Sequence, residues 1–130
     1  MSFFKPSSIV RFVNATQGSI VCEKGAIADS FWTRGKGLLG RKSLPEDEGI
    51  YLAPGKSIHM FGMKFAIDVV FLTKGDVVAD LTENLKIGRM YNAKAHGGHK
   101  PWGALELPPG TVARSGTRIG DQLKRETAGS

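Results

Sequence analysis

The sequence contains a single cysteine, Cys22, so no disulfide can form within the chain. Nothing in its cysteine usage therefore favours an oxidising compartment. It also lacks any apolar stretch close to the ~18 residues that a membrane span needs. The opening MSFFKPSSIVRFVNATQGS has no basic segment followed by an apolar run, as a signal peptide would have. We expect a soluble cytoplasmic protein with no membrane partner.

Long runs of like charge are absent as well. The chain has 18 basic and 12 acidic residues and a net charge of +6, and acids separate its small basic groups. No aromatic residues alternate with the basic ones along a strand, and no recognition-helix motif is present. We therefore interpret the basic excess as a solvated surface and do not expect nucleic acid as the partner. The sequence does not indicate an oligomeric state.

The length of 130 residues suits one domain covering residues 1–130. We expect its core within about residues 9–124 and a disordered tail over residues 125–130. With 41% hydrophobic residues, the chain can fold around a core without a disulfide or a structural metal.

Short segments with alternating or β-branched apolar residues dominate the chain and predict strands. They lie at 9–13, 19–22, 49–53, 57–61, 65–72, 77–81 and 104–107, with a last short strand ending near 124. The segment 65–72, FAIDVVFL, is the strongest of them. Residues 88–103 have no periodicity and predict a long loop.

The principal helix is predicted after the second strand, where Asp29 or Ser30 can cap it. Its apolar face would hold Ile27, Phe31, Leu38 and Leu39. A single helical turn is expected just after Pro108-Pro109-Gly110. These patterns together predict an α+β fold that is mainly β, with a small, strongly curved or barrel-like antiparallel sheet and one principal helix packed on it.

Two carboxylates lie in apolar strands and need a partner. Asp68 interrupts FAIDVVFL, where neither face is polar, and Glu106 lies in ALELP. A buried carboxylate must be hydrogen-bonded or paired, or its pKa rises. Each could accept hydrogen bonds from an arginine, such as Arg34, Arg41 or Arg114, or from the backbone of a turn. Alternatively, the two could form a general acid–base pair.

Two groups of residues could bind a metal. His59, Met60 and Met63 offer an imidazole and two thioethers, which suit Cu(I). In a strand, however, His59 and Met60 point to opposite faces. His96 and His99 form a second pair, but no other ligand lies in their loop and zinc spacings are absent. We expect neither a metal site nor a cofactor.

Two further features resemble functional sites only superficially. Cys22 lies in an apolar strand without an obvious base, which is typical of a small core residue. The segment GKGLLGRKS is glycine-rich and basic, but its spacing is not that of a P-loop.

Three segments resemble, in order, the domain of unknown function 192 (DUF192) family of bacteria and archaea. They are FWTRGKGLLGRKSLPEDEGIYLAP, IHMFGMKFAIDVVFL and ALELPPGTVARSGTRIGD, and the resemblance extends from about Ser19 to Leu123. The family's middle motif usually has tryptophan before the methionine and Lys-Asn-Thr after it. Here His59 stands at the tryptophan position and Phe61-Gly62-Met63 replaces the polar triplet.

The resemblance implies a small β-rich, barrel-like domain with one helix, and no established activity. It implies characteristic residues at Arg34, Gly37, Leu38, Arg41, Met60, Asp68, Glu106, Leu107, Gly110, Gly120 and Asp121.

Our leading functional hypothesis is a small non-catalytic domain that binds an anionic small molecule or a protein. Its cleft would be lined by Trp32, Arg34, Arg41, His59, Met60, Asp68 and Glu106, and the 88–103 loop could cover it. One alternative is a hydrolase-like enzyme in which Asp68 and Glu106 act as paired carboxylates. Another is a purely structural or interaction module.

Overall fold

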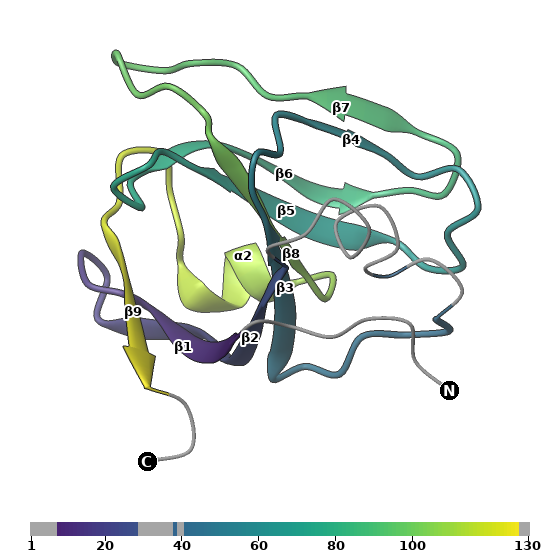
Figure 1. Cartoon of the computed structure of the whole chain (residues 1–130), viewed down its shortest axis with the longest axis horizontal. Coiled ribbons are helices and arrows are strands. Elements are labelled where there is room, and N and C mark those ends of the chain that lie inside the picture. The colour runs from purple at the N-terminus through teal and green to yellow at the C-terminus, as the bar shows by residue number, and fades with distance from the viewer. Residues whose placement is uncertain (1–7, 29–37, 39–40, 128–130) are drawn as a thin grey trace.

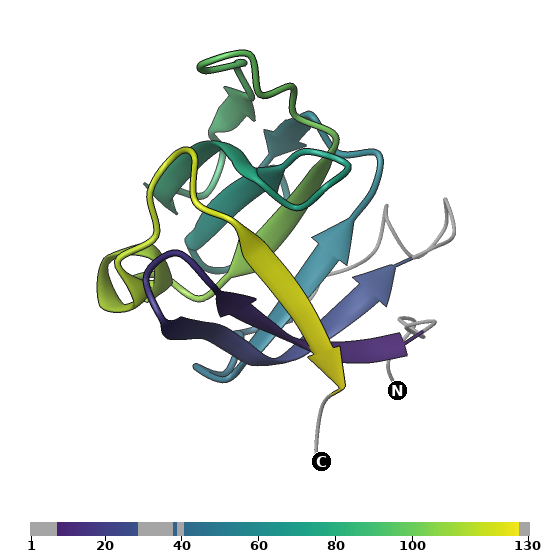
Figure 2. The ribbon, with the colours of Figure 1, turned by 90° about the vertical axis from the view of Figure 1, so that its left-hand side faces the viewer.

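The computed structural model describes residues 8–28, 38 and 41–127. Seven strands form one curled sheet in the order β6-β5-β8-β3-β2-β1-β9 (Figures 1 and 2). Their bounds are β1 Ser8–Asn14, β2 Ser19–Ala28, β3 Glu48–Leu52, β5 Ile67–Leu72, β6 Val78–Leu85, β8 Gly103–Leu107 and β9 Leu123–Thr127. A smaller sheet pairs β4 (Ser57–His59) with β7 (Met90–Asn92), and the helix α2 covers Thr111–Ser115.

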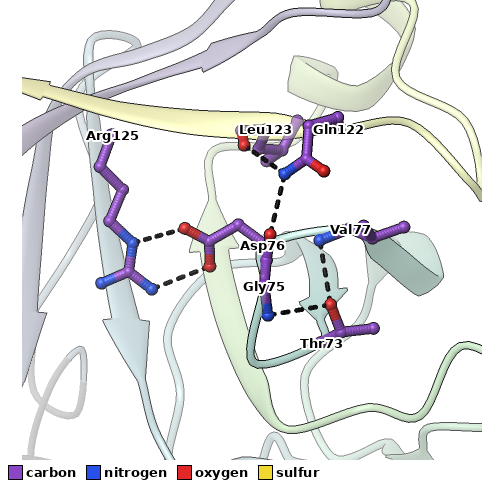
Figure 3. A network of polar contacts seen from close by, with 7 residues as sticks. All are labelled: Thr73, Gly75, Asp76, Val77, Gln122, Leu123 and Arg125. Atoms are coloured by element: carbon purple, nitrogen blue, oxygen red, sulfur yellow. Dashed lines mark hydrogen bonds and ion pairs between the residues drawn. The ribbon is translucent and has the colours of Figure 1, made fainter.

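The two edge strands of the large sheet, β6 and β9, meet at one end and curl it into a half-barrel. The Val78 amide donates to the Asp121 carbonyl at 2.8 Å, and the Leu123 amide donates to the Asp76 carbonyl at 2.9 Å. Arg125 of β9 donates two hydrogen bonds to the Asp76 carboxylate, at 2.8 and 3.0 Å (Figure 3). A bidentate arginine–carboxylate pair fixes geometry as well as adding energy, so it holds the two edges in register.

The curl gives the sheet an inner and an outer core. The inner core receives side chains from every strand of the large sheet and from α2: Phe12, Val21, Cys22, Tyr51, Val70, Leu72, Val78, Leu105, Leu107, Val112 and Leu123. The outer core lies on the other face and joins that sheet to the small one: Ala28, Leu38, Leu44, Ile50, Leu52, Ile58, Met60, Ile67, Val69, Phe71, Leu85 and Ala104. Alternate residues of β5 enter the two cores, which explains why both of its faces are apolar.

The observed architecture confirms the predicted mainly-β, strongly curved fold. Each predicted strand overlaps an observed one, although the last is expected to end near 124 and β9 runs over Leu123–Thr127. The helical turn after Pro108-Pro109-Gly110 is α2. The sheet pairs are antiparallel except β2 and β3, which are parallel. The expectation of an antiparallel sheet is therefore wrong for this one pair of strands. No helix within the described residues has the length and apolarity to cross a membrane.

Three local predictions need correction or fall outside the described chain. Ile27 was expected in the principal helix, but it lies in β2, and apart from Leu38 the rest of that helix lies outside the described residues. Residues 125–127 are not a disordered tail, because they complete β9 and pair with β1. The segment 88–103 is not an irregular loop throughout, because it contains β7.

Candidate functional site

Asp68 is fully buried on β5 and is held by backbone amides. Its carboxylate accepts from the Asn84 amide at 2.8 Å and from the Val112 amide at 2.9 Å. Asn84 has a positive φ of 51° and lies within a register shift in the pairing of β5 with β6. The bulged strand thus turns this amide toward Asp68. The carboxylate thus links β5 to β6 and α2, and its partners are backbone amides rather than an arginine.

Glu106 is buried on β8 without a comparable set of donors. It is 8% exposed and makes no hydrogen bond or ion pair with another described residue. It pairs with Ile50 on one side and Val69 on the other, both in the outer core. Burial in this apolar environment raises the pKa of Glu106 to about 7.

The pairing register puts the two carboxylates on opposite faces of the sheet. Asp68 lies opposite Leu107, whose side chain enters the inner core, whereas Glu106 lies opposite Val69 of the outer core. Residues directly opposite each other in a sheet share a face. Asp68 and Glu106 therefore cannot act on one substrate as an acid–base pair, and the geometry argues against the hydrolase-like alternative.

The other residues of the predicted cleft do not converge on one cavity. Met60 is 1% exposed and packs in the outer core, while His59, its neighbour on β4, is exposed. Arg41 is only partly buried and lies 3.5 Å from the Glu48 carboxylate. Trp32 and Arg34 lie outside the described residues.

The candidate metal ligands are also dispersed. His59 and Met60 point in different directions, as the strand geometry predicts, and Met63 packs against the outer core. His96 and His99 face each other across an isolated bridge, but His96 contacts Asp80. Across the described ranges no three His, Cys, Asp or Glu side chains form a group that could hold a metal.

Cys22 lies in the inner core and is chemically protected. Burial raises the pKa of its thiol to about 12. Because the thiolate is the reactive form, this cysteine is not a nucleophile at neutral pH. The interpretation of Cys22 as a core residue is confirmed.

A different surface has the features of a small-molecule site. A cleft of about 630 Å³ opens between the β5–β6 turn and the loop that precedes β8. We call it the lysine cleft. It is lined by Lys56, Thr73, Lys74, Gly75, Gly98, His99, Lys100, Pro101 and Trp102. Among the described residues its lining carries three lysines and no carboxylate, and its volume falls within the range of ligand pockets.

Hydrogen bonds fix both walls of the lysine cleft. Thr73 accepts through its hydroxyl from the amides of Gly75 and Val77, which sets the β5–β6 turn (Figure 3). On the other wall the Trp102 amide donates to the Leu72 carbonyl, and its own carbonyl accepts from Gly55, both at 2.8 Å. The Lys74 ammonium lies 4.5 Å from the centre of the Trp102 ring. The cleft is therefore built from turns whose backbone conformation is already set.

Asp80 anchors the loop that carries the second wall. This β6 residue is 2% exposed and accepts from the Tyr91 hydroxyl at 2.9 Å and the Lys94 amide at 2.8 Å. His96 lies 3.2 Å from the same carboxylate. Burial, followed by the hydrogen bond to Asp80, raises the pKa of Tyr91 to about 12. The segment after β7 is thus fastened to the large sheet.

Sequence reasoning did not find the lysine cleft because its residues are spread over three segments. Lys56, Lys74 and Lys100 are far apart in the chain and no motif links them. A weak local signal existed, since each lies next to or close to a glycine or proline of a turn. The absence of an acid from the lining could be recognised only after the segments were brought together.

The model of the DUF192 family, described as "Uncharacterized ACR", matches residues 12–125. The chain belongs to the DUF192 family. The resemblance noted from three sequence segments is thereby confirmed, and the family is one of unknown function.

Relatives of this DUF192 protein occur in archaea. It is 32% identical to a UPF0127 protein of Thermococcus sibiricus, over 88% of this chain and 73% of the relative. It is also 32% identical to a UPF0127 protein of Pyrococcus furiosus, over 86% of this chain and 95% of the relative.

A solved structure supports the fold. A candidate transcription regulator from Sinorhizobium meliloti superposes with a TM-score of 0.77 at 21% identity, covering 96% of this chain and 98% of that chain. At this identity the similarity concerns the fold alone.

Several residues characteristic of DUF192 shape this fold. Gly110 and Gly120 have φ values of 91° and 94°, a backbone region that side chains disfavour. Asp121 accepts from the side chains of Asn14 and Gln17 and from the Arg118 amide. Burial opposes the ionised form of Asp121, but these hydrogen bonds outweigh it and lower its pKa. At these positions the family residues stabilise turns.

Proposed function

We propose that this DUF192 protein is a non-catalytic domain that binds an anionic small molecule in the lysine cleft. The observation that supports the proposal is the composition of the lining, which joins three lysines, an imidazole and an indole without a carboxylate. This site replaces the cleft expected around Asp68 and Glu106, whose side chains lie on opposite faces of the sheet.

The charge of the lining selects the ligand class. Lys56, Lys74 and Lys100 make no ion pair with any other described residue, so their ammonium groups can donate to a ligand. Ammonium donors form strong hydrogen bonds with carboxylate and phosphate oxygens. Trp102 adds an apolar surface beside them. A small molecule with two or more anionic groups and a compact body fits this arrangement best.

The non-catalytic part of the proposal rests on the lining. Among the described residues of the lining, His99 is the one titratable side chain besides the lysines, and no carboxylate lies beside it there. General acid–base catalysis normally needs a positioned partner group within hydrogen-bond distance of the reacting atom. Binding is therefore the activity that this set of side chains supports.

We also propose a cytoplasmic location. The lone Cys22 is buried and cannot form an internal disulfide, which suits a reducing compartment. Fractionation of cells that express the full chain at native level tests this; recovery in an extracytoplasmic fraction would contradict it.

Calorimetric titration with inorganic phosphate, pyrophosphate and citrate tests the binding proposal. We expect binding that strengthens with the number of charges on the anion and weakens with salt. The double variant Lys74→Ala/Lys100→Ala should lose about a hundredfold or more in affinity, since each charged hydrogen bond contributes roughly 1.5–3 kcal/mol.

The matched control is Lys124→Ala, which removes an exposed lysine of β9 that is not part of the cleft lining. It should bind the anions as the unaltered protein does. An equal loss in the control and the cleft variant would assign binding to net charge alone and overturn the proposal. No binding of any of the three anions by the unaltered chain would overturn it as well.

A further inference from the structure

The most exposed large hydrophobic side chains gather at the end of the molecule opposite the lysine cleft. Phe61 is 60% exposed, Met90 59% and Ile87 54%, and these are the highest values for large hydrophobic residues in the described chain. Isolated exposed hydrophobics are common on proteins, but clustered ones mark interaction sites.

Hydrogen bonds hold the two turns that carry these residues side by side. The Met60 amide donates to the Arg89 carbonyl at 2.7 Å, and the Gly88 amide donates to the Met60 carbonyl at 3.1 Å. Both turns, one after β4 and one before β7, lie at the same end of the structure (Figure 1). Gly62 and Gly88, with φ of 79° and 80°, allow each chain to reverse tightly. Phe61 and Ile87 therefore protrude at two adjacent turn tips.

The apolar surface continues onto the outer face of the small sheet. The His59 and Phe61 rings are 5.8 Å apart, and His59 pairs with Met90 across β4 and β7. We call the four residues His59, Phe61, Ile87 and Met90 the apolar tip. The next outward-facing pair, Ser57 and Asn92, is polar and joined by a hydrogen bond of 2.8 Å. Polarity therefore rises with distance from the turns.

Basic side chains surround the apolar tip. Lys64, Lys86 and Arg89 are exposed, and none of them forms an ion pair with another described residue. One exposed acid, Glu83 on β6, lies in the adjoining segment. The local charge is therefore positive, in line with the net charge of +6.

We propose that the apolar tip is a docking site for the surface of an anionic lipid bilayer. The protruding apolar side chains would contact the acyl chains, and the polar pair behind them would lie at the interface. The nearby basic side chains would contact the anionic headgroups. A flat protein interface of standard size would need roughly 800 Å² of contact on each partner. Two narrow turns suit shallow insertion better than they suit such an interface.

Docking of this kind does not need a membrane span. The sequence-based expectation of no membrane partner rested on the missing apolar segment, whereas peripheral attachment needs only a few apolar side chains and nearby positive charge. The tip and the lysine cleft share no residue. Either proposal can therefore fail without the other.

Co-sedimentation with vesicles tests the proposal. We expect the full chain to sediment with vesicles of phosphatidylcholine and phosphatidylglycerol but not with phosphatidylcholine alone. Phe61→Ser/Ile87→Ser and, separately, Lys86→Glu/Arg89→Glu should each lower the vesicle affinity about tenfold or more. In a Phe61→Trp variant, the emission should shift to the blue with anionic vesicles by more than in the unaltered chain.

Two control variants separate tip docking from other causes. Ile119→Ser removes an isoleucine that is 42% exposed in a turn elsewhere, and Lys74→Glu/Lys100→Glu alters the lysine cleft. Both should keep at least most of the vesicle affinity. The proposal is overturned if the unaltered chain does not sediment with anionic vesicles, or if the controls lose as much affinity as the tip variants. Self-association that disappears in Phe61→Ser/Ile87→Ser would assign the tip to a second copy and overturn it too.

Discussion

Asp68 and Glu106 lie on neighbouring strands of one sheet, and both are buried, yet their surroundings differ. Asp68 enters the inner side of the half-barrel, where the amides of Asn84 and Val112 donate to it. Glu106 enters the outer core, and within the described residues no group donates to it. The pKa of Glu106 consequently rises to about 7 through burial. Burial alone does not determine how a carboxylate behaves; the donors that its face of the sheet supplies also matter.

Removing Asp68 should have the largest effect. Asp68→Ala leaves two amide groups without an acceptor, and each unsatisfied buried group costs roughly 1–3 kcal/mol. We expect the free energy of unfolding to fall by about 3 kcal/mol or more, measured by urea denaturation. Asp68→Asn keeps one carbonyl oxygen as an acceptor and should cost roughly 1–3 kcal/mol. If Asp68→Ala were as stable as Glu106→Ala or more stable, the proposed difference between the two faces of the sheet would be wrong.

Glu106 should make stability depend on pH in the direction opposite to that of a carboxylate whose pKa is lowered by hydrogen bonds, such as Asp121. Its pKa rises from an ordinary 4.5 to about 7 on folding, so the folded state binds more protons than the unfolded state between these values. Stability is therefore highest below pH 4.5 with respect to this group, decreases as the pH rises through about 7, and then levels off. This pKa shift corresponds to a difference of about 3 kcal/mol in the free energy of unfolding between low and high pH.

The glutamine variant isolates this contribution. Glu106→Gln has no proton to release, so its stability should not fall between pH 5 and pH 8 by this mechanism, and at pH 8 it should equal or exceed that of the unaltered chain. Denaturation at a series of pH values provides the measurement. Parallel pH profiles for the two proteins would show that folding does not raise the pKa of Glu106.

Gln17→Ala should have the smallest effect on stability. It tests a third carboxylate, Asp121, which accepts hydrogen bonds as Asp68 does. Gln17 is exposed and donates to Asp121 at 3.1 and 3.3 Å, one of several hydrogen bonds that lower the pKa of Asp121. We expect a loss of about 0.5–1 kcal/mol at neutral pH. The loss should shrink on acidification below the ordinary pKa of 3.8, because the contribution of a lowered pKa disappears there. A loss that is constant down to pH 2 would exclude an electrostatic origin.

The sequence by itself determined the local structure of this protein. Alternation and β-branching set the strands, with FAIDVVFL predicting the buried β5, and Pro108-Pro109-Gly110 marked the entry to α2. These features depend on side-chain periodicity and allowed φ values, which are determined by residues close together in the sequence. The need of Asp68 for a partner also followed from its apolar neighbours.

Only the tertiary structure decided which distant groups meet. Asp68 accepts from amides 16 and 44 residues away, β2 pairs in parallel with β3, and the lysine cleft collects Lys56, Lys74 and Lys100 from separate segments. It also put Asp68 and Glu106 on opposite faces, against the cleft expected from the sequence. Strand order and register determine these contacts between residues distant in sequence. Both depend on how the whole sheet buries its two faces and not on any local pattern.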